Sequence, residues 1–258
     1  MAVPIIVPSH KRSKTLFAPY TIANTEVCIP ESQLAEYQSD HPDVKFVTHP
    51  DSVIGISAKR QWIYDKYGDV FMVDDDVTVV RRMMLPPEYE RTEEMEDFKD
   101  ELTPDEAYEV IQHLYELAKD MGAYVYGFTH VGNPKHVKPQ TPFSFNSLLS
   151  GHCMGLLKSD KLAYPTDEGA KSCEDHYMCL LCAYYHRFWL VDNRYGFIRY
   201  PTDKNSGGMA DHRTIDQEKL AYQYMKEKFG DVVQLKDKTG EKRQGHAHPY
   251  ERAIRMPY

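Results

Sequence analysis

The sequence predicts an α/β protein built on one mostly parallel central sheet with helices on both faces. Short apolar, β-branched runs alternate along the chain with stretches of helical period, as is typical of parallel sheets joined by crossover helices. At about 150 residues per domain, 258 residues favour a single domain over 1–258. No apolar run approaches the ~18 residues of a membrane span, so no membrane partner is expected. Five cysteines in a chain of this length favour a reducing cytoplasm.

The first 80 residues are predicted to form one half of the sheet. Apolar runs bounded by turn residues predict strands at Ala2–Val7, Thr25–Ile29, Val44–Val47 and Val70–Val73. A short helix is expected from Pro30 through Tyr37, and a second one after Gly55, carrying Trp62, Ile63 and Tyr67.

The clearest helix signal lies between Thr103 and Gly122. Thr103 and Glu106 form a capping box around Pro104 at the first helical position, and Gly122 ends the apolar periodicity. Further strands are expected at Tyr124–Phe128, His152–Leu157, Phe188–Val191 and Phe197–Tyr200, and further helices from a Ser172-Cys173-Glu174-Asp175 cap to about Arg187 and from Thr214 to about Gly230. Residues 131–147 and 205–208 are expected to be loops, and the tail after Lys236 is polar and basic.

The acidic residues are concentrated in one segment. Residues 86–120 carry 13 acids and three bases, which leaves +2 on the rest of a chain whose net charge is −8. A local acidic segment of this kind does not argue against an anionic partner elsewhere on the surface.

Asp74, Asp75 and Asp76 follow the apolar run Val70–Val73 directly. Three consecutive carboxylates at the end of a buried strand repel one another unless something compensates their charge. Hard oxygen ligands select Mg²⁺ or Mn²⁺, which commonly bridge carboxylates to phosphates, and the carboxyl ends of parallel strands are where α/β folds bind ligands. We therefore expect a divalent cation here; the alternative is a solvated acidic turn.

Two further segments carry groups suited to a nucleotide. Pro8, Ser9 and Arg12 leave the first strand with a hydroxyl and a guanidinium. Gly55 lets the backbone approach a ligand, and Arg60 on the following helix can reach a diphosphate. The sequence lacks the glycine patterns of dinucleotide folds and of P-loops, which disfavours both classes.

Glu174 and Asp175 are expected at a helix N-terminus, where acids are favoured by the helix dipole. They serve either as caps or as a general base near an acceptor hydroxyl. A nearby set of cysteines and histidines also invites a zinc interpretation, but one short helix cannot wrap four ligands around a tetrahedral ion. The set comprises Cys173, His176, Cys179, Cys182 and His186, and buried free thiols are the better interpretation of its cysteines.

The order of these motifs resembles the GT-A glycosyltransferase layout: strand–Pro-Ser-x-x-Arg, Gly-x-x-x-x-Arg on a helix, strand–Asp-Asp-Asp, and Glu-Asp on a later helix. The opening Ile-Val-Pro-Ser-His-Lys-Arg, and Arg60-Gln61-Trp62 before the acids, resemble more closely the TET-associated glycosyltransferases, found largely in bacteriophages and linked to sugar addition on 5-hydroxymethylcytosine in DNA. The resemblance covers most of residues 3–215. It implies a GT-A-like nucleotide-sugar-binding Rossmann-type sandwich, located in the host cytoplasm if phage-encoded.

The resemblance also implies roles for individual residues. Residues 1–80 would bind a UDP-sugar and 122–230 the acceptor, with 236–258 as a basic tail. The nucleotide would contact Pro8, Ser9 and Arg12, and the diphosphate or sugar Arg60. Asp74 would lie near the ribose or sugar, and Asp76 would be the direct ligand of Mn²⁺ or Mg²⁺, with His212 as a further candidate ligand. Asp175 is the preferred base and Glu174 the alternative.

A DNA acceptor is an implication of the resemblance alone. The basic loop around Lys135 and Lys138, with Phe143 and Phe145 nearby, could hold DNA through phosphate contacts and stacking; a solvated basic loop is the alternative. Three other functions stay open: sugar transfer to a small molecule or protein, a sugar nucleotidyltransferase, and a non-catalytic DNA-binding or phage-assembly module.

Overall fold

The computed structural model describes residues 1–84, 100–138, 140–167, 172–200, 214–236 and 249–256. Within these ranges the main sheet contains β1 (Ile5–Pro8), β2 (Thr25–Pro30), β3 (Lys45–His49), β4 (Val70–Val73), β5 (Val77–Arg82), β6 (Val125–Thr129), β7 (Phe143–Ser144), β8 (Cys153–Leu156) and β9 (Leu190–Arg199). The helices are α1 (Ala18–Thr21), α2 (Leu34–Asp40), α3 (Ile56–Tyr67), α4 (Pro104–Met121), α5 (Glu174–His186) and α6 (Ile215–Phe229).

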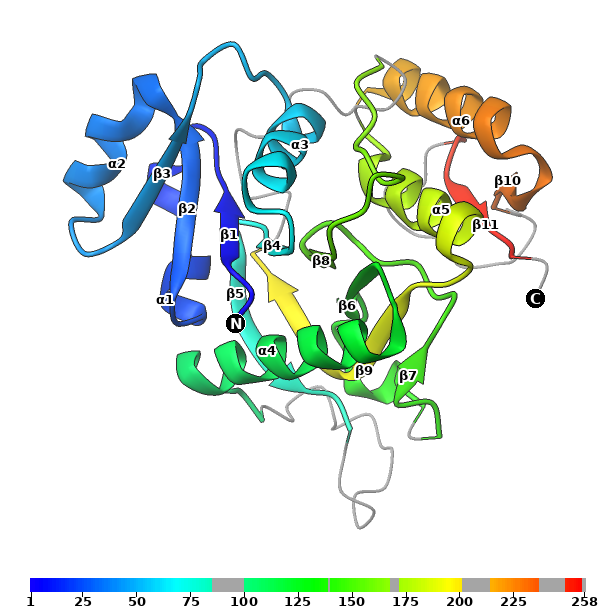
Figure 1. The fold of residues 1–258 in the computed structure, drawn as a ribbon, viewed down its shortest axis with the longest axis horizontal. Helices are drawn as coiled ribbons and strands as arrows, with labels where there is room; N and C mark the ends of the chain where they lie inside the picture. The colour runs from blue at the N-terminus through cyan, green and yellow to red at the C-terminus, as the bar shows by residue number, and fades with distance from the viewer. Residues whose placement is uncertain (85–99, 139, 168–171, 201–213, 237–248, 257–258) are drawn as a thin grey trace.

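The sheet is mostly parallel, as predicted. Its strand order is β3-β2-β1-β4-β8-β6-β9-β5, and β7 pairs with β9 (Figure 1). Parallel ladders join β3, β2, β1 and β4, and another joins β6 to β9. The strand β8 runs against both of its neighbours, and β5 and β7 run against β9. The carboxyl ends of β1, β2 and β4 therefore meet at one edge.

Helices cover both faces because the strand residues alternate in direction. Ile5 and Val7 belong to a core that includes residues of α1, α2 and α4. Ile6 belongs to a second core, formed with α3 and α5. Within the described ranges, no helix is long and apolar enough to cross a bilayer.

A third, smaller cluster packs on the outer side of α5. It joins Leu180 of α5 to Ala221 and Met225 of α6 and to Val233 of β10 (Val233–Leu235). The strand β10 pairs antiparallel with β11 (Arg252–Ile254). Figure 1 shows α6 and this two-stranded sheet beside α5, away from β1–β4. The tail after Lys236, expected as a polar segment, thus contributes a strand.

Local signals located most elements correctly, and long-range pairing explains the errors. Thr103 and Glu106 form the predicted capping box, and Thr214 caps α6. The strand β5 was not predicted, because its apolar residues directly follow the acidic turn, Asp74–Asp76, and alternate with polar residues. The two strands expected at Phe188–Val191 and Phe197–Tyr200 are one strand, β9. Its polar middle resembles a turn in sequence, but pairing with β5, β6 and β7 keeps it extended.

The predicted cap of α5 is also wrong. The N-cap residue is Cys173, and no side chain there makes a capping hydrogen bond. The Ser172 hydroxyl is buried without a partner in the described part of the chain. The helix α5 therefore lacks a capping hydrogen bond from its N-cap residue.

Candidate active site

A cavity of about 560 Å³ lies at the carboxyl ends of β1, β2 and β4, within the size range of ligand pockets. The structure brings together every predicted site residue that it describes, namely Pro8, Ser9, Arg12, Gly55, Arg60, Asp74, Asp75, Asp76, Glu174 and Asp175. His212 lies outside the described residues, so its role stays a prediction.

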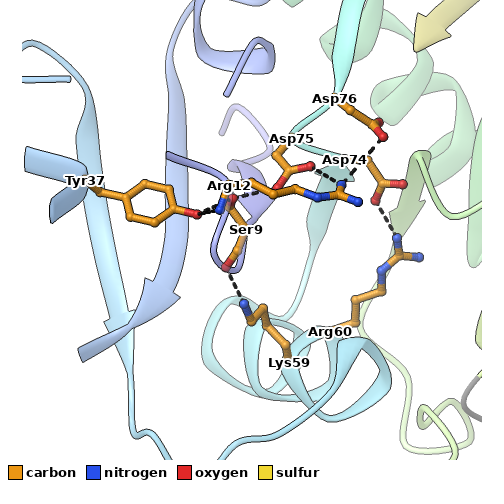
Figure 2. A network of polar contacts seen from close by, with 8 residues as sticks. All are labelled: Ser9, Arg12, Tyr37, Lys59, Arg60, Asp74, Asp75 and Asp76. Carbon is orange, nitrogen blue, oxygen red and sulfur yellow. Dashed lines mark hydrogen bonds and ion pairs between the residues drawn. The ribbon is translucent and has the colours of Figure 1, made fainter. Parts of the chain in front are cut away.

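A buried network of hydrogen bonds and ion pairs connects the segment after β1 to the acidic turn (Figure 2). Ser9 Oγ donates to Asp75 Oδ2 over 2.6 Å and lies 2.8 Å from the Tyr37 hydroxyl. Arg12 Nη1 donates to Asp75 Oδ1 over 2.9 Å and lies 3.6 Å from Asp76 Oδ2. Lys59 Nζ donates to the Ser9 carbonyl. Both carboxylate oxygens of Asp75 are thus bonded within the protein, and this residue shapes the loop that lines the cavity.

Arg60 connects the acidic turn to α5. Its side chain is 2% exposed, its Nη2 donates to Asp74 Oδ1 over 2.7 Å, and its Nη1 lies 3.7 Å from Glu174 Oε1. Burial opposes the charge, but Asp74 and Glu174 outweigh it and raise the pKa of Arg60 above its usual value. Arg60 therefore stays charged and holds two carboxylates from distant parts of the chain in one cavity.

The loop before β8 completes this arrangement. The Gly151 amide donates to Asp175 Oδ2 over 3.1 Å, and the His152 carbonyl accepts from the Asp74 amide over 3.1 Å. A Cβ atom at Gly151 would overlap the guanidinium of Arg60. Glycine avoids this overlap, because the backbone passes directly against the buried arginine.

Asp76 is the acid with an unused oxygen. Its Oδ1 is buried and has no hydrogen-bond partner among the described residues. Burial, followed by repulsion from Asp74 and Asp75, raises the pKa of Asp76 to about 7. A buried oxygen whose charge is disfavoured fits a hard divalent cation, which would restore the ionised form. The described part of the chain contains no group of three or more His, Cys, Asp or Glu side chains arranged to hold a metal.

Glu174 and Asp175 have opposite pKa shifts. Burial and the neighbouring Asp175 raise the pKa of Glu174 to about 7. Burial would also raise the pKa of Asp175, but His176 and the Gly151 amide outweigh it and hold that pKa below its usual range. Both oxygens of Asp175 accept backbone amides, from Gly151 and from His176 at 2.7 Å. Of the two, Glu174 is the one poised to exchange a proton near neutral pH.

Sequence reasoning missed several cavity residues. Lys59 is 4% exposed, and burial lowers its pKa to about 8. Burial, together with the charge of Arg199, lowers the pKa of His152 to about 4, so its imidazole is neutral. Two sequence signals could have indicated these residues. Lys59 directly precedes Arg60 on α3, and His152 is the first residue of a predicted strand. Nothing local indicates that Arg199 would line the cavity.

The cysteines are buried in the structure. The cysteines 28, 153, 173, 179 and 182 are all buried and free. Burial raises the pKa of Cys173 and Cys182 to about 12, so both stay protonated. The interpretation of Cys173, Cys179 and Cys182 as buried free thiols is confirmed.

With this geometry in place, the comparisons assign the chain. The sequence model of the TET-Associated Glycosyltransferase family matches residues 3–208. The chain belongs to this family. It is a nucleotide-sugar-dependent glycosyltransferase, and the family associates it with sugar transfer to modified DNA.

Other comparisons add little to this assignment. None of the curated proteins matches the sequence. Among solved structures, the chain is similar to a CMP:2-keto-3-deoxy-manno-octonic acid synthetase complexed with CTP. That likeness has a TM-score of 0.37 and 10% identity, over 88% of this chain and 100% of the other. A likeness at this level supports no conclusion about activity.

Proposed function

We propose that this glycosyltransferase moves a sugar from a UDP-sugar to the hydroxyl of 5-hydroxymethylcytosine in DNA, with Mn²⁺ or Mg²⁺ at the acidic turn. The observation that carries the proposal is the convergence, in one cavity of a family member, of the acidic turn, the arginines and the Glu174–Asp175 pair. A direct assay of sugar on hydroxymethylated DNA tests it.

The charge balance of the cavity supports a cation together with a diphosphate. Six carboxylates and five Lys or Arg side chains line it, so its net charge is −1 when all are ionised. A divalent cation would change this to +1, which suits the leaving nucleoside diphosphate. Asp76 and Asp74 would hold the cation, with His212 as a further candidate ligand. When bound, such an ion supplies charge neutralisation at the leaving group.

The Asp76→Asn variant tests this cation site in two ways. We expect metal-dependent nucleotide-sugar binding to weaken tenfold or more, about 1.4 kcal/mol, as read by calorimetry. In metal-free protein the same variant should be more stable above pH 7, on the order of 2 kcal/mol. Because the pKa of Asp76 is raised in the folded protein, the protonated carboxyl favours the folded state. This stabilisation is complete below the pKa of Asp76 in the unfolded chain, and it is lost as pH rises through about 7.

The control is Asp100→Asn, which removes a carboxylate that pairs with Arg82 outside the cavity. Equal donor affinity with and without metal in the wild-type protein would contradict the site. So would a melting temperature of metal-free Asp76→Asn that follows the wild type from pH 5 to pH 8.

Proton removal from the acceptor is assigned to the Glu174–Asp175 pair. The acceptor oxygen forms its bond to the anomeric carbon while the bond from that carbon to the diphosphate breaks, and the hydroxyl proton passes to a carboxylate. The sequence favoured Asp175 as that base. Its lowered pKa and its two amide bonds instead suit a group that stays ionised and fixes the Gly151 loop. We therefore propose Glu174 as the base.

The acceptor side is proposed to include the loop that follows β6. This loop leaves the sheet at the same edge as the cavity, and its last residues, 150–152, line it. Lys138 is exposed, and Lys135 is partly exposed on the short helical turn Pro134–His136. A target base in a duplex must leave the stack to reach a cavity of this kind.

Reversing both loop lysines, Lys135→Glu with Lys138→Glu, should weaken DNA binding and flatten its dependence on salt, because each lost phosphate contact reduces the salt slope by about one. Donor hydrolysis should be unchanged. The matched control reverses Lys158 and Lys161, which are exposed at the opposite end of β8. If the control weakens DNA binding as much as the loop variant, the loop is not the DNA contact.

A further inference from the structure

The helix α5 packs against a part of the chain that the family match does not cover. The match ends at residue 208, whereas α6, β10 and β11 follow it. These elements pack on α5 through the third apolar cluster. Tyr177 of α5 adds ring contacts, with centroid distances of 5.9 Å to Tyr224 and 5.3 Å to Phe229.

One buried cation ties this C-terminal unit, defined as residues 214–236 and 249–256, to the start of α5. The Arg252 side chain is 7% exposed. Its Nη2 donates to the Ser172 carbonyl over 3.0 Å, and its Nη1 lies 3.1 Å from Glu218 Oε2 on α6. Ser172 is two residues before Glu174, so the guanidinium of Arg252 holds the backbone that leads into the Glu174–Asp175 pair.

The contact matters because Cys173, the N-cap residue of α5, makes no side-chain capping hydrogen bond. An uncapped helix start frays unless a partner fixes it. Here a charge-assisted hydrogen bond from a buried arginine restrains that backbone instead. Glu174 and Asp175 are the first two residues of the helix, so a loosened first turn would move both carboxylates relative to Arg60 and the Gly151 loop.

We propose that Arg252 is a positioning residue of the transferase, and that the C-terminal unit functions as a brace for the Glu174–Asp175 pair. Arg252 is not among the residues that line the cavity, and it acts through the Ser172 backbone. The inference rests on the proposed role of the carboxylate pair for its kinetic consequences, but its structural consequence is independent of that role.

Arg252→Met should reduce kcat for sugar transfer by about tenfold or more, because displacement of catalytic groups is costly, while KM for the nucleotide-sugar stays within about twofold. Arg252→Lys keeps one donor and should recover part of the lost kcat. The matched control is Lys226→Met, which breaks the exposed Lys226–Asp231 pair at the end of α6 in the same unit; its kcat should equal that of the wild type.

Hydrogen exchange gives the readout that does not need activity. In Arg252→Met the amide of Tyr177, which donates to Cys173 in the first turn of α5, should exchange at least tenfold faster, while amides of α4 keep their rates. Glu218→Gln retains the bond to Ser172 and should show a smaller change, which covers the case in which Arg252→Met does not fold. Unchanged kcat and unchanged exchange at Tyr177 would overturn the proposal. An inactive wild type with faster exchange in Arg252→Met would overturn only the proposed function.

Discussion

Glu174→Gln should lower the turnover of sugar transfer by roughly 10²–10⁴-fold while leaving nucleotide-sugar binding nearly intact. The amide keeps the size of the side chain but cannot accept the acceptor proton. The pKa of Glu174 is raised to about 7 by burial and by Asp175, so wild-type kcat should fall as pH drops below 7, where the base becomes protonated. Kinetics from pH 5 to pH 9 with saturating donor and acceptor measure both effects.

Asp175→Asn is the matched variant for this test. It should cost less than Glu174→Gln, because the asparagine oxygen still accepts the Gly151 amide. It should keep the acidic limb of the pH profile but move it to lower pH, because the charge of Asp175 no longer raises the pKa of Glu174. If Asp175→Asn instead shows the larger loss and removes the acidic limb of the profile, the base is Asp175 and Glu174 is its neighbour.

Arg60→Met should destabilise the protein by about 3–5 kcal/mol and abolish activity. Removing the buried guanidinium leaves Asp74 and Glu174 without the cation that holds them, and two uncompensated carboxylates in one cavity repel each other. Denaturant titration at pH 8 measures the loss. A smaller loss is expected at pH 5, where Glu174 is protonated.

The control is Arg82→Met. Arg82 also pairs with two carboxylates, Asp100 and Glu106, but its side chain is 41% exposed, and exposed pairs contribute about 0–1 kcal/mol. If the two variants lose equal unfolding free energy, the ion pairs of Arg60 contribute no more than those of an exposed arginine. The buried guanidinium would then not be what holds Asp74 and Glu174 in the cavity.

The sequence predicted the parts whose signals are local. The strand Val70–Val73 and the acids after it were recognised because an apolar run ends abruptly in charge. The capping box of α4 was recognised because both partners lie within four residues. The same local reasoning placed ten predicted site residues, which the fold then gathers in one cavity.

Features that depend on distant contacts were not predictable in this way. The middle of β9 is polar in sequence, and only pairing with β5, β6 and β7 keeps it extended. Ser172 matches a helix cap in sequence, yet the backbone there is held by Arg252, 80 residues further on. The choice between Glu174 and Asp175 depends on burial and on the Gly151 amide, which no local pattern encodes.

Sugar transfer to DNA is tested most directly by weighing the nucleosides. Duplexes that contain 5-hydroxymethylcytosine, and matched duplexes with plain cytosine, are incubated with a panel of UDP-sugars and Mn²⁺, digested, and analysed by mass spectrometry. We predict a hexose-sized or similar sugar increment on the hydroxymethylated nucleoside alone, because unmodified cytosine offers no primary hydroxyl to attack. Absence of any increment with every donor, together with glycosylation of a small molecule or peptide by the same preparation, would contradict the proposed acceptor.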